Sequence, residues 1–186
     1  MPKTIIIFIC VLVYISGNSQ PLYKGKLVSG LTGKPIKGAY IEFNSVLLGD
    51  TDSTGAFTIA LDIANDIPLI FYSPEIGWIV KENLNFYKDS IALITLTPEC
   101  EYSAEKDIQE EKFKLFIASG PFSPSLTKAD YKFEKKYAVN YYGDGDCTSA
   151  IATDCLYMYN QTIFTYLDKK YGKNWRKKVN KNVYGL

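Results

Sequence analysis

The sequence predicts an all-β sandwich of about seven antiparallel strands, followed by a small α+β module. Two observations predict the sandwich: apolar and polar residues alternate in short runs, and turn-forming residues separate those runs at regular spacing. The second module is predicted by apolar residues spaced three and four apart, beyond residue 126. Hydrophobic residues make up 47% of the 186 residues and charged residues 22%, as expected of a chain that folds.

The first nineteen residues have the layout of a secretory signal peptide. Lys3 supplies a basic start, an apolar run covers residues 5–15, and small residues precede a predicted cleavage between Ser19 and Gln20. The apolar run is shorter than the roughly 18 to 20 residues that cross a bilayer, so we expect cleavage rather than a retained anchor. We therefore expect an exported protein, located in the periplasm, on the cell surface or in the medium.

Residues 20–98 are predicted to form the sandwich. Phe57, Ile59 and Leu61 alternate with Thr58, and Asp52 and Gly55 have the chemistry of a tight turn just before them. The same pattern of alternation and turns predicts strands at 22–28, 39–43, 46–51, 56–61, 68–72, 78–84 and 91–96.

Three segments of this region carry a family resemblance. They are residues 33–41, with Gly-Lys-Pro-Ile followed by Gly-Ala-Tyr-Ile, residues 51–57, which read Thr-Asp-Ser-Thr-Gly-Ala-Phe, and Gly77-Trp78. This region resembles the carboxypeptidase-regulatory-like domain, which is a transthyretin-like (prealbumin-like) sandwich. The resemblance implies a non-catalytic accessory role, because such domains stand beside exopeptidases and in front of bacterial outer-membrane transport receptors.

Residues 99–112 form a predicted acidic connector. They contain six carboxylates and two lysines, and such a run of like charges is usually solvated. We expect this segment to be exposed and partly helical.

Residues 113–186 are predicted to alternate strands and helices. We expect a strand at 112–117, a helix over 127–137 with Thr127 as its N-cap, and a second strand near 139–142. A longer helix should follow, capped by Thr153 or Asp154 and ended at Gly172. Its apolar stripe comprises Leu156, Tyr159, Ile163, Leu167 and Tyr171, and Trp175, Val179 and Val183 form one more short helical face.

The segment 133–137 reads Phe-Glu-Lys-Lys-Tyr, and Tyr171-Gly172 precede Trp175 by a few residues. In these features the second module resembles the FEKKY family, which is named after that motif and occurs in small exported bacterial proteins of unknown function. The resemblance implies a folded unit and assigns no chemistry to it.

Histidine is absent from the chain. This excludes Ser–His and Cys–His nucleophiles and histidine-built metal sites. The segment from Asp50 to Thr54 begins like a calcium-binding loop, but Leu61 stands where the bidentate Glu is required. The sequence therefore predicts no metal site and no cofactor.

Three cysteines follow the predicted leader, and export favours a disulfide. We expect Cys147 to pair with Cys155 across a short loop of small residues. Cys100 could instead pair with either of them.

Two further clusters are candidate sites. Asp144 and Asp146, with Asp154 nearby, could serve a histidine-free hydrolase, although a Gly/Asp turn followed by a helix cap explains them better. The basic stretch from 169 to 181 could contact anionic lipid through Lys169, Lys173, Arg176 and Lys177, or form a solvated face at a helix C-terminus. Nucleic acid is excluded as a partner by the predicted export.

We therefore expect a non-enzymatic envelope or secreted protein whose sandwich contacts another protein or a glycan. One alternative is a small hydrolase that uses Asp144 and Asp146. Another is an accessory subunit that docks on an outer-membrane receptor.

Overall fold

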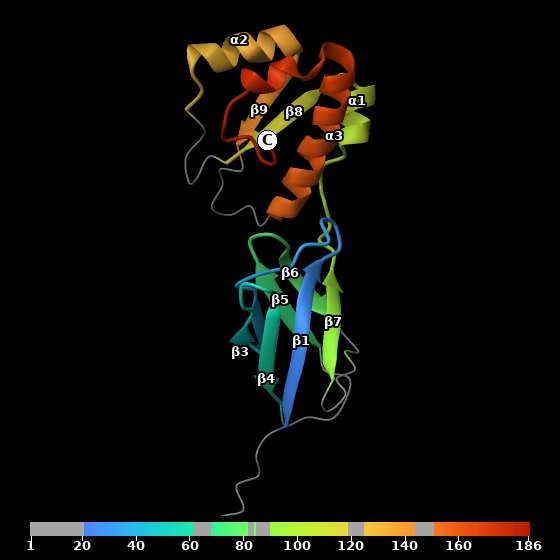
Figure 1. Cartoon of the computed structure of the whole chain (residues 1–186), viewed down its shortest axis with the longest axis vertical. Coiled ribbons are helices and arrows are strands. Elements are labelled where there is room, and N and C mark those ends of the chain that lie inside the picture. The colour runs from blue at the N-terminus through green and yellow to red at the C-terminus, as the bar shows by residue number, and fades with distance from the viewer. Residues whose placement is uncertain (1–20, 62–67, 82–83, 85–89, 119–124, 144–150) are drawn as a thin grey trace, which may run out of the picture.

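The computed structural model describes residues 21–61, 68–81, 84, 90–118, 125–143 and 151–186 (Figure 1). Seven strands come first and are followed by a mixed unit of helices and two further strands. Buried side chains form two separate hydrophobic clusters, one in each of these parts. Within the described residues, no helix is both long and apolar enough to cross a membrane.

The first part consists of two sheets. One has the strand order β4-β1-β7 and the other has the order β3-β2-β5-β6. The strands start and end within about three residues of the predicted ranges: β1 Leu22–Ser29, β2 Tyr40–Phe43, β3 Val46–Asp50, β4 Ala56–Ala60, β5 Leu69–Ser73, β6 Gly77–Lys81 and β7 Ile91–Leu96.

One pairing differs from the expected antiparallel arrangement. Strand β1 pairs with β7 in parallel, with Lys24 opposite Ile91 and Ser29 opposite Leu96. Parallel neighbours need a long crossover connection, and here the chain from β2 to β6 supplies it. The first and last strands of the sandwich therefore lie side by side (Figure 1).

The interior of the sandwich is filled by the alternate residues that the period of two predicts. Phe57 lies on β4 opposite Gly25 of β1, and a Cβ atom at Gly25 would stand 2.3 Å from the Phe57 ring. Gly25 thus leaves the space that the ring fills. The other buried apolar side chains are Leu27, Ile36, Ala39, Ile41, Ile59, Leu61, Leu69, Phe71, Ile76, Ile94 and Leu96.

The second part contains two parallel strands and their helices. Strand β8 (Phe113–Ile117) pairs in parallel with β9 (Val139–Gly143), and α2 (Lys128–Tyr137) lies in the connection between them. Thr127 caps α2 as predicted, within a capping box in which Asp130 bonds back to the Thr127 backbone. Helix α3 (Thr153–Tyr171) and a short 3₁₀ helix, η1 (Lys173–Lys177), complete the unit.

A buried amide ties these elements together. Asn160 of α3 is fully buried and accepts a hydrogen bond from the Phe116 N–H at 2.9 Å. Its side-chain nitrogen donates to the carbonyl oxygens of Phe116, at 2.8 Å, and Tyr184, at 3.0 Å. One side chain therefore joins α3, β8 and the C-terminal segment.

The predicted acidic connector is helical over α1 (Ala104–Gln109), but it is not simply a solvated linker. Ala104 and Asp107 are buried, and Ala104 belongs to the hydrophobic cluster of the second part. The Asp107 carboxylate accepts hydrogen bonds from Tyr159 and Lys114, each at 2.6 Å. The apolar contacts of Ala104 and the hydrogen bonds of Asp107 explain why an acidic helix packs against the second part.

Helix α3 begins against the sandwich, which corrects its predicted cap. Neither Thr153 nor Asp154 caps it with a side chain, since the N-cap is Ala152. Instead, the N–H groups of Thr153 and Asp154 donate to the carbonyl oxygens of Pro74 and Glu75, at 3.0 and 3.1 Å. The Asp154 carboxylate accepts a hydrogen bond from Ser29, so it is engaged with the sandwich rather than with its own helix.

The disulfide also differs from the predicted pair. Cys155 is bonded to Cys100, with the Cα atoms 5.5 Å apart, so the predicted Cys147–Cys155 pairing is wrong. Two bridges cannot share Cys155, and Cys147 itself lies outside the described residues. The chain leaving β7 passes beside the first turn of α3, where the Cys155 sulfur is also 3.8 Å from the Glu99 carbonyl oxygen.

Candidate functional site

Several predicted site residues fall outside the described part of the chain. They are Ser19 and Gln20 at the predicted cleavage point, and Asp144, Asp146 and Cys147 before α3. The structure therefore gives no geometry for signal cleavage or for a hydrolase built on the Asp144 region.

The predicted calcium-like segment forms a turn. The Asp52 carboxylate accepts hydrogen bonds from the Thr54 N–H and hydroxyl, both at 2.8 Å, and from the Ala56 N–H at 3.0 Å. The bonds from Thr54, and then that from Ala56, hold the pKa of Asp52 below its ordinary value. Among the residues that the structure describes, no group of three or more Cys, Asp or Glu side chains could hold a metal ion.

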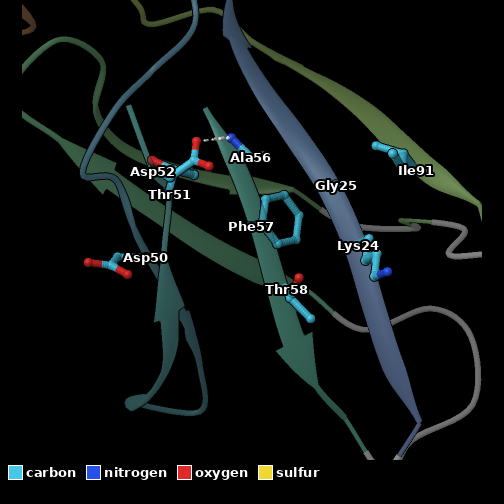
Figure 2. A pocket seen from close by; sticks show the side chains of 9 residues that line it. All are labelled: Lys24, Gly25, Asp50, Thr51, Asp52, Ala56, Phe57, Thr58 and Ile91. Carbon is cyan, nitrogen blue, oxygen red and sulfur yellow. Dashed lines mark hydrogen bonds between the residues drawn. The ribbon is translucent and has the colours of Figure 1, made fainter. Parts of the chain in front are cut away.

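An open cavity of about 360 Å³ lies on the sandwich beside this turn (Figure 2). The Phe57 ring and Gly25 form part of its wall, and Lys24 is the one lysine that lines it. Two of its polar side chains already serve the fold: Asp52 holds the turn, and the Thr51 hydroxyl donates to the Ile36 carbonyl and accepts from the Ala39 N–H. The remaining lining residues are Asp50, Asp52, Ala56, Thr58 and Ile91, and this set contains no nucleophile bonded to a base.

The four predicted cationic contacts are not equivalent. Lys169, Lys173 and Lys177 are exposed, whereas Arg176 binds the Asp168 carboxylate through two hydrogen bonds, at 3.1 and 3.0 Å. Asp168 also accepts from the Trp175 indole N–H at 2.9 Å, and the Arg176 bonds are the main reason that its pKa is lowered. Arg176 therefore links η1 to α3 through its bonds to Asp168, whereas Lys169, Lys173 and Lys177 remain exposed to solvent.

A row of aromatic side chains crosses the outer face of the four-stranded sheet. Tyr40 of β2 lies opposite Tyr72 of β5, and Tyr72 lies opposite Trp78 of β6. Tyr40 is 48% exposed and Trp78 is 57% exposed, although aromatic side chains of this size are usually buried. We call these three residues the aromatic row.

The rings of the row stack on one another. The Tyr72 and Trp78 ring centres are 4.4 Å apart with their planes inclined by 27°, and those of Tyr40 and Tyr72 are 6.4 Å apart at 11°. If two rings lay side by side in one plane, their edge carbons would overlap when the ring centres were 4.4 Å apart. The rings of Tyr72 and Trp78 therefore face each other. One face of Tyr72 and one face of Trp78 therefore cover each other.

Aliphatic side chains extend this surface. The next row across the same face contains Leu47, Ile70 and Val80, with Glu42 between Leu47 and Ile70. Leu47 and Val80 are more than half exposed. The result is an apolar and aromatic patch over β2, β5 and β6, with Leu47 of β3 on the other side of Glu42, and such a patch is typical of a contact surface.

Sequence reasoning missed this patch as a site. All three residues lie in predicted strands, and Tyr40 and Trp78 also belong to the quoted motifs, but the sequence marks none of them as a site residue. The alternation of the strands does indicate their exposure, since all three aromatic residues occupy positions whose side chains point to the solvent face of the sheet. Their alignment in one row depends on the register of three strands, which the alternation does not define.

Comparison with known proteins assigns no identity to the chain. No family model matches the sequence, and no curated protein matches it.

Proposed function

We propose that this is an exported, non-enzymatic protein whose sandwich binds a partner protein through the outer face of the β3-β2-β5-β6 sheet. The aromatic row of Tyr40, Tyr72 and Trp78 is the observation that carries the proposal. Tyr and Trp are enriched among the residues that dominate protein–protein binding energy, because they offer large rigid contact areas at low entropic cost.

The geometry of the row favours a protein over a glycan. A sugar ring packs best on the free face of an aromatic ring, but one face of Tyr72 and one of Trp78 are covered by each other. Leu47 and Val80, exposed beside the row, have no hydrogen-bonding groups to offer sugar hydroxyls. A partner protein can bury aromatic rings and aliphatic side chains together.

Two observations support export. The predicted leader precedes the described chain, and the Cys100–Cys155 disulfide is the kind of bond that persists in oxidising compartments. The carboxypeptidase-regulatory-like and FEKKY identities are part of the proposal and rest on the quoted motifs. An outer-membrane receptor is one partner that the first resemblance suggests.

The experiment is affinity capture from envelope fractions with three forms of the chain in parallel: wild type, Trp78→Thr and Ile91→Thr. Ile91 is 71% exposed on β7, in the other sheet, so its substitution removes a similarly exposed apolar group away from the row. We expect one stoichiometric protein with the wild type and with I91T. W78T should recover it at least tenfold less, since a central aromatic contact contributes about 2 kcal/mol or more.

Circular dichroism should show that both variants remain folded. Equal recovery of that partner by W78T and the wild type would contradict the proposal. Binding of purified envelope polysaccharide by the wild type, with loss in W78T and no protein partner, would replace the protein by a glycan.

A further inference from the structure

We propose that the end of the second module farthest from the sandwich is a docking surface for anionic phospholipid membranes. This distal surface consists of α2, the last turn of α3, η1 and the residue after η1. Its exposed cations are Lys128, Lys132, Lys135, Lys136, Lys169, Lys170, Lys173, Lys177 and Lys178. The inference is independent of the aromatic row, which lies on the sandwich.

Two segments distant in sequence build this surface. Helix α2 and the chain from 168 onward meet through aromatic contacts: the Tyr137 ring centre is 5.2 Å from that of Tyr171, and Phe133 is 6.3 Å from Trp175. Figure 1 shows α2 at the end of the molecule opposite the sandwich, which is also where α3 finishes. The lysines of α2 thereby join those that follow Asp168 in one region.

The carboxylates in this region are already engaged inside the fold. Asp130 accepts from the Thr127 backbone and hydroxyl, and Glu134 accepts from the Tyr141 N–H at 2.8 Å. Asp168 accepts from Trp175 and Arg176. Within the described residues of this surface, none of these acids forms an ion pair with a lysine. The exposed lysines outnumber these acids and form no ion pair with them, so the surface carries a net positive charge.

The kind of cation points to a membrane rather than to a discrete phosphate pocket or an acidic protein motif. Arginine binds a carboxylate or phosphate in a bidentate manner, through two parallel hydrogen bonds. The one arginine of this surface is already paired with Asp168. Lysines act as point charges on flexible stems, which suits the diffuse negative charge of a lipid surface.

Exposed tyrosines strengthen the lipid assignment. Tyr131 on α2 is 58% exposed, and Tyr171 at the end of α3 is 39% exposed. Amphipathic rings among lysines are typical of proteins that rest at the headgroup level, where the ring is partly buried and the hydroxyl stays in water. Docking by this end would leave the sandwich pointing away from the bilayer.

The test is flotation of the chain from Gln20 onward with two kinds of vesicle. One contains phosphatidylglycerol mixed with phosphatidylcholine, and the other contains phosphatidylcholine alone. Lys132→Gln with Lys173→Gln removes one charge from each segment of the distal surface. Lys24→Gln with Lys37→Gln is the matched control, because both lysines are exposed on the sandwich.

We expect the wild type to bind the anionic vesicles and not the neutral ones. Each lysine near a charged membrane contributes about fivefold in partitioning, so the distal pair should lower it roughly 25-fold and the control pair by less than about twofold. Binding should also weaken strongly between about 50 mM and about 500 mM salt.

Four results would overturn the proposal. The first three are equal binding to both vesicles, an equal loss in the distal and control variants, and no binding of the folded wild type to anionic vesicles at low salt. The fourth is displacement by inorganic phosphate at constant ionic strength, because it would indicate a discrete phosphate site.

Discussion

Cys100 lies four residues beyond the last strand of the sandwich and is bonded to Cys155 in the first turn of α3. The same turn donates its N–H groups to the carbonyl oxygens of Pro74 and Glu75, and its Asp154 accepts from Ser29. A covalent bond and three hydrogen bonds therefore hold α3 on the sandwich. The position of α3 relative to the sandwich is thus built into the fold.

Replacing both Cys100 and Cys155 by Ser should destabilise the protein. The bridge spans 55 residues, and closing a loop of this size contributes about 4 kcal/mol in the chain-entropy treatment. We expect a lower urea midpoint, measured by tryptophan fluorescence and far-ultraviolet circular dichroism under non-reducing conditions.

Cys147→Ser is the matched control for the disulfide. Because Cys155 is already bonded to Cys100, the C147S variant should unfold at the wild-type midpoint. A loss of stability in C147S as large as that in the double variant would show that the bridge includes Cys147.

Asn160→Ala should be among the more damaging substitutions of α3. It removes three hydrogen bonds from a fully buried place, two to the backbone of Phe116 and one to the Tyr184 carbonyl, at a cost of about 3 kcal/mol. Thr162→Ala removes only a bond to the Met158 carbonyl of the same helix and should change stability by less than about 0.5 kcal/mol. Chemical denaturation of the two variants measures this difference, and equal effects would contradict the role of Asn160.

Asp107 should make stability depend on acid pH. Burial is the largest single influence on this carboxyl and opposes its ionisation, but the hydrogen bonds from Lys114 and Tyr159 and the Lys114 charge outweigh it, so its pKa is lowered. A group with a lowered folded pKa stabilises the protein above its unfolded pKa, ordinarily 3.8, and this contribution is lost as pH falls through the lower folded value.

The free energy of unfolding should therefore decrease as the pH falls below about 4, and Asp107→Asn should be less stable at neutral pH with a flatter acid dependence. Urea titrations at several pH values measure both effects. Glu101→Gln, at an exposed residue shortly before α1, should follow the wild-type curve. An unchanged acid slope in D107N would refute the assignment.

Gly25 and Phe57 should be energetically coupled. A methyl group at Gly25 would meet the Phe57 ring at 2.3 to 2.5 Å, so Gly25→Ala should cost about 1 to 3 kcal/mol through overpacking. Phe57→Leu removes the ring atoms that collide with the new methyl group. The double variant should therefore lose less stability than the sum of the two single variants, and strict additivity in this cycle would exclude the contact.

The sequence by itself determined the local structure of this protein. The alternation and turns defined all seven strands of the sandwich, and the Thr127 N-cap and the apolar stripes defined α2 and α3. Each of these signals involves residues only a few positions apart, so their chemistry acts before the chain is compact. The export signal is a prediction of the same local kind.

Only the tertiary structure decided which distant residues meet. The parallel pairing of β1 with β7, the Cys100–Cys155 bridge and the capping of α3 by Pro74 and Glu75 join residues that no short pattern connects. The aromatic row and the distal surface also require strands and helices to be placed side by side. The physical reason is that such contacts are selected by burial and packing of the whole chain, whereas periodicity reports only which face of one element turns inward.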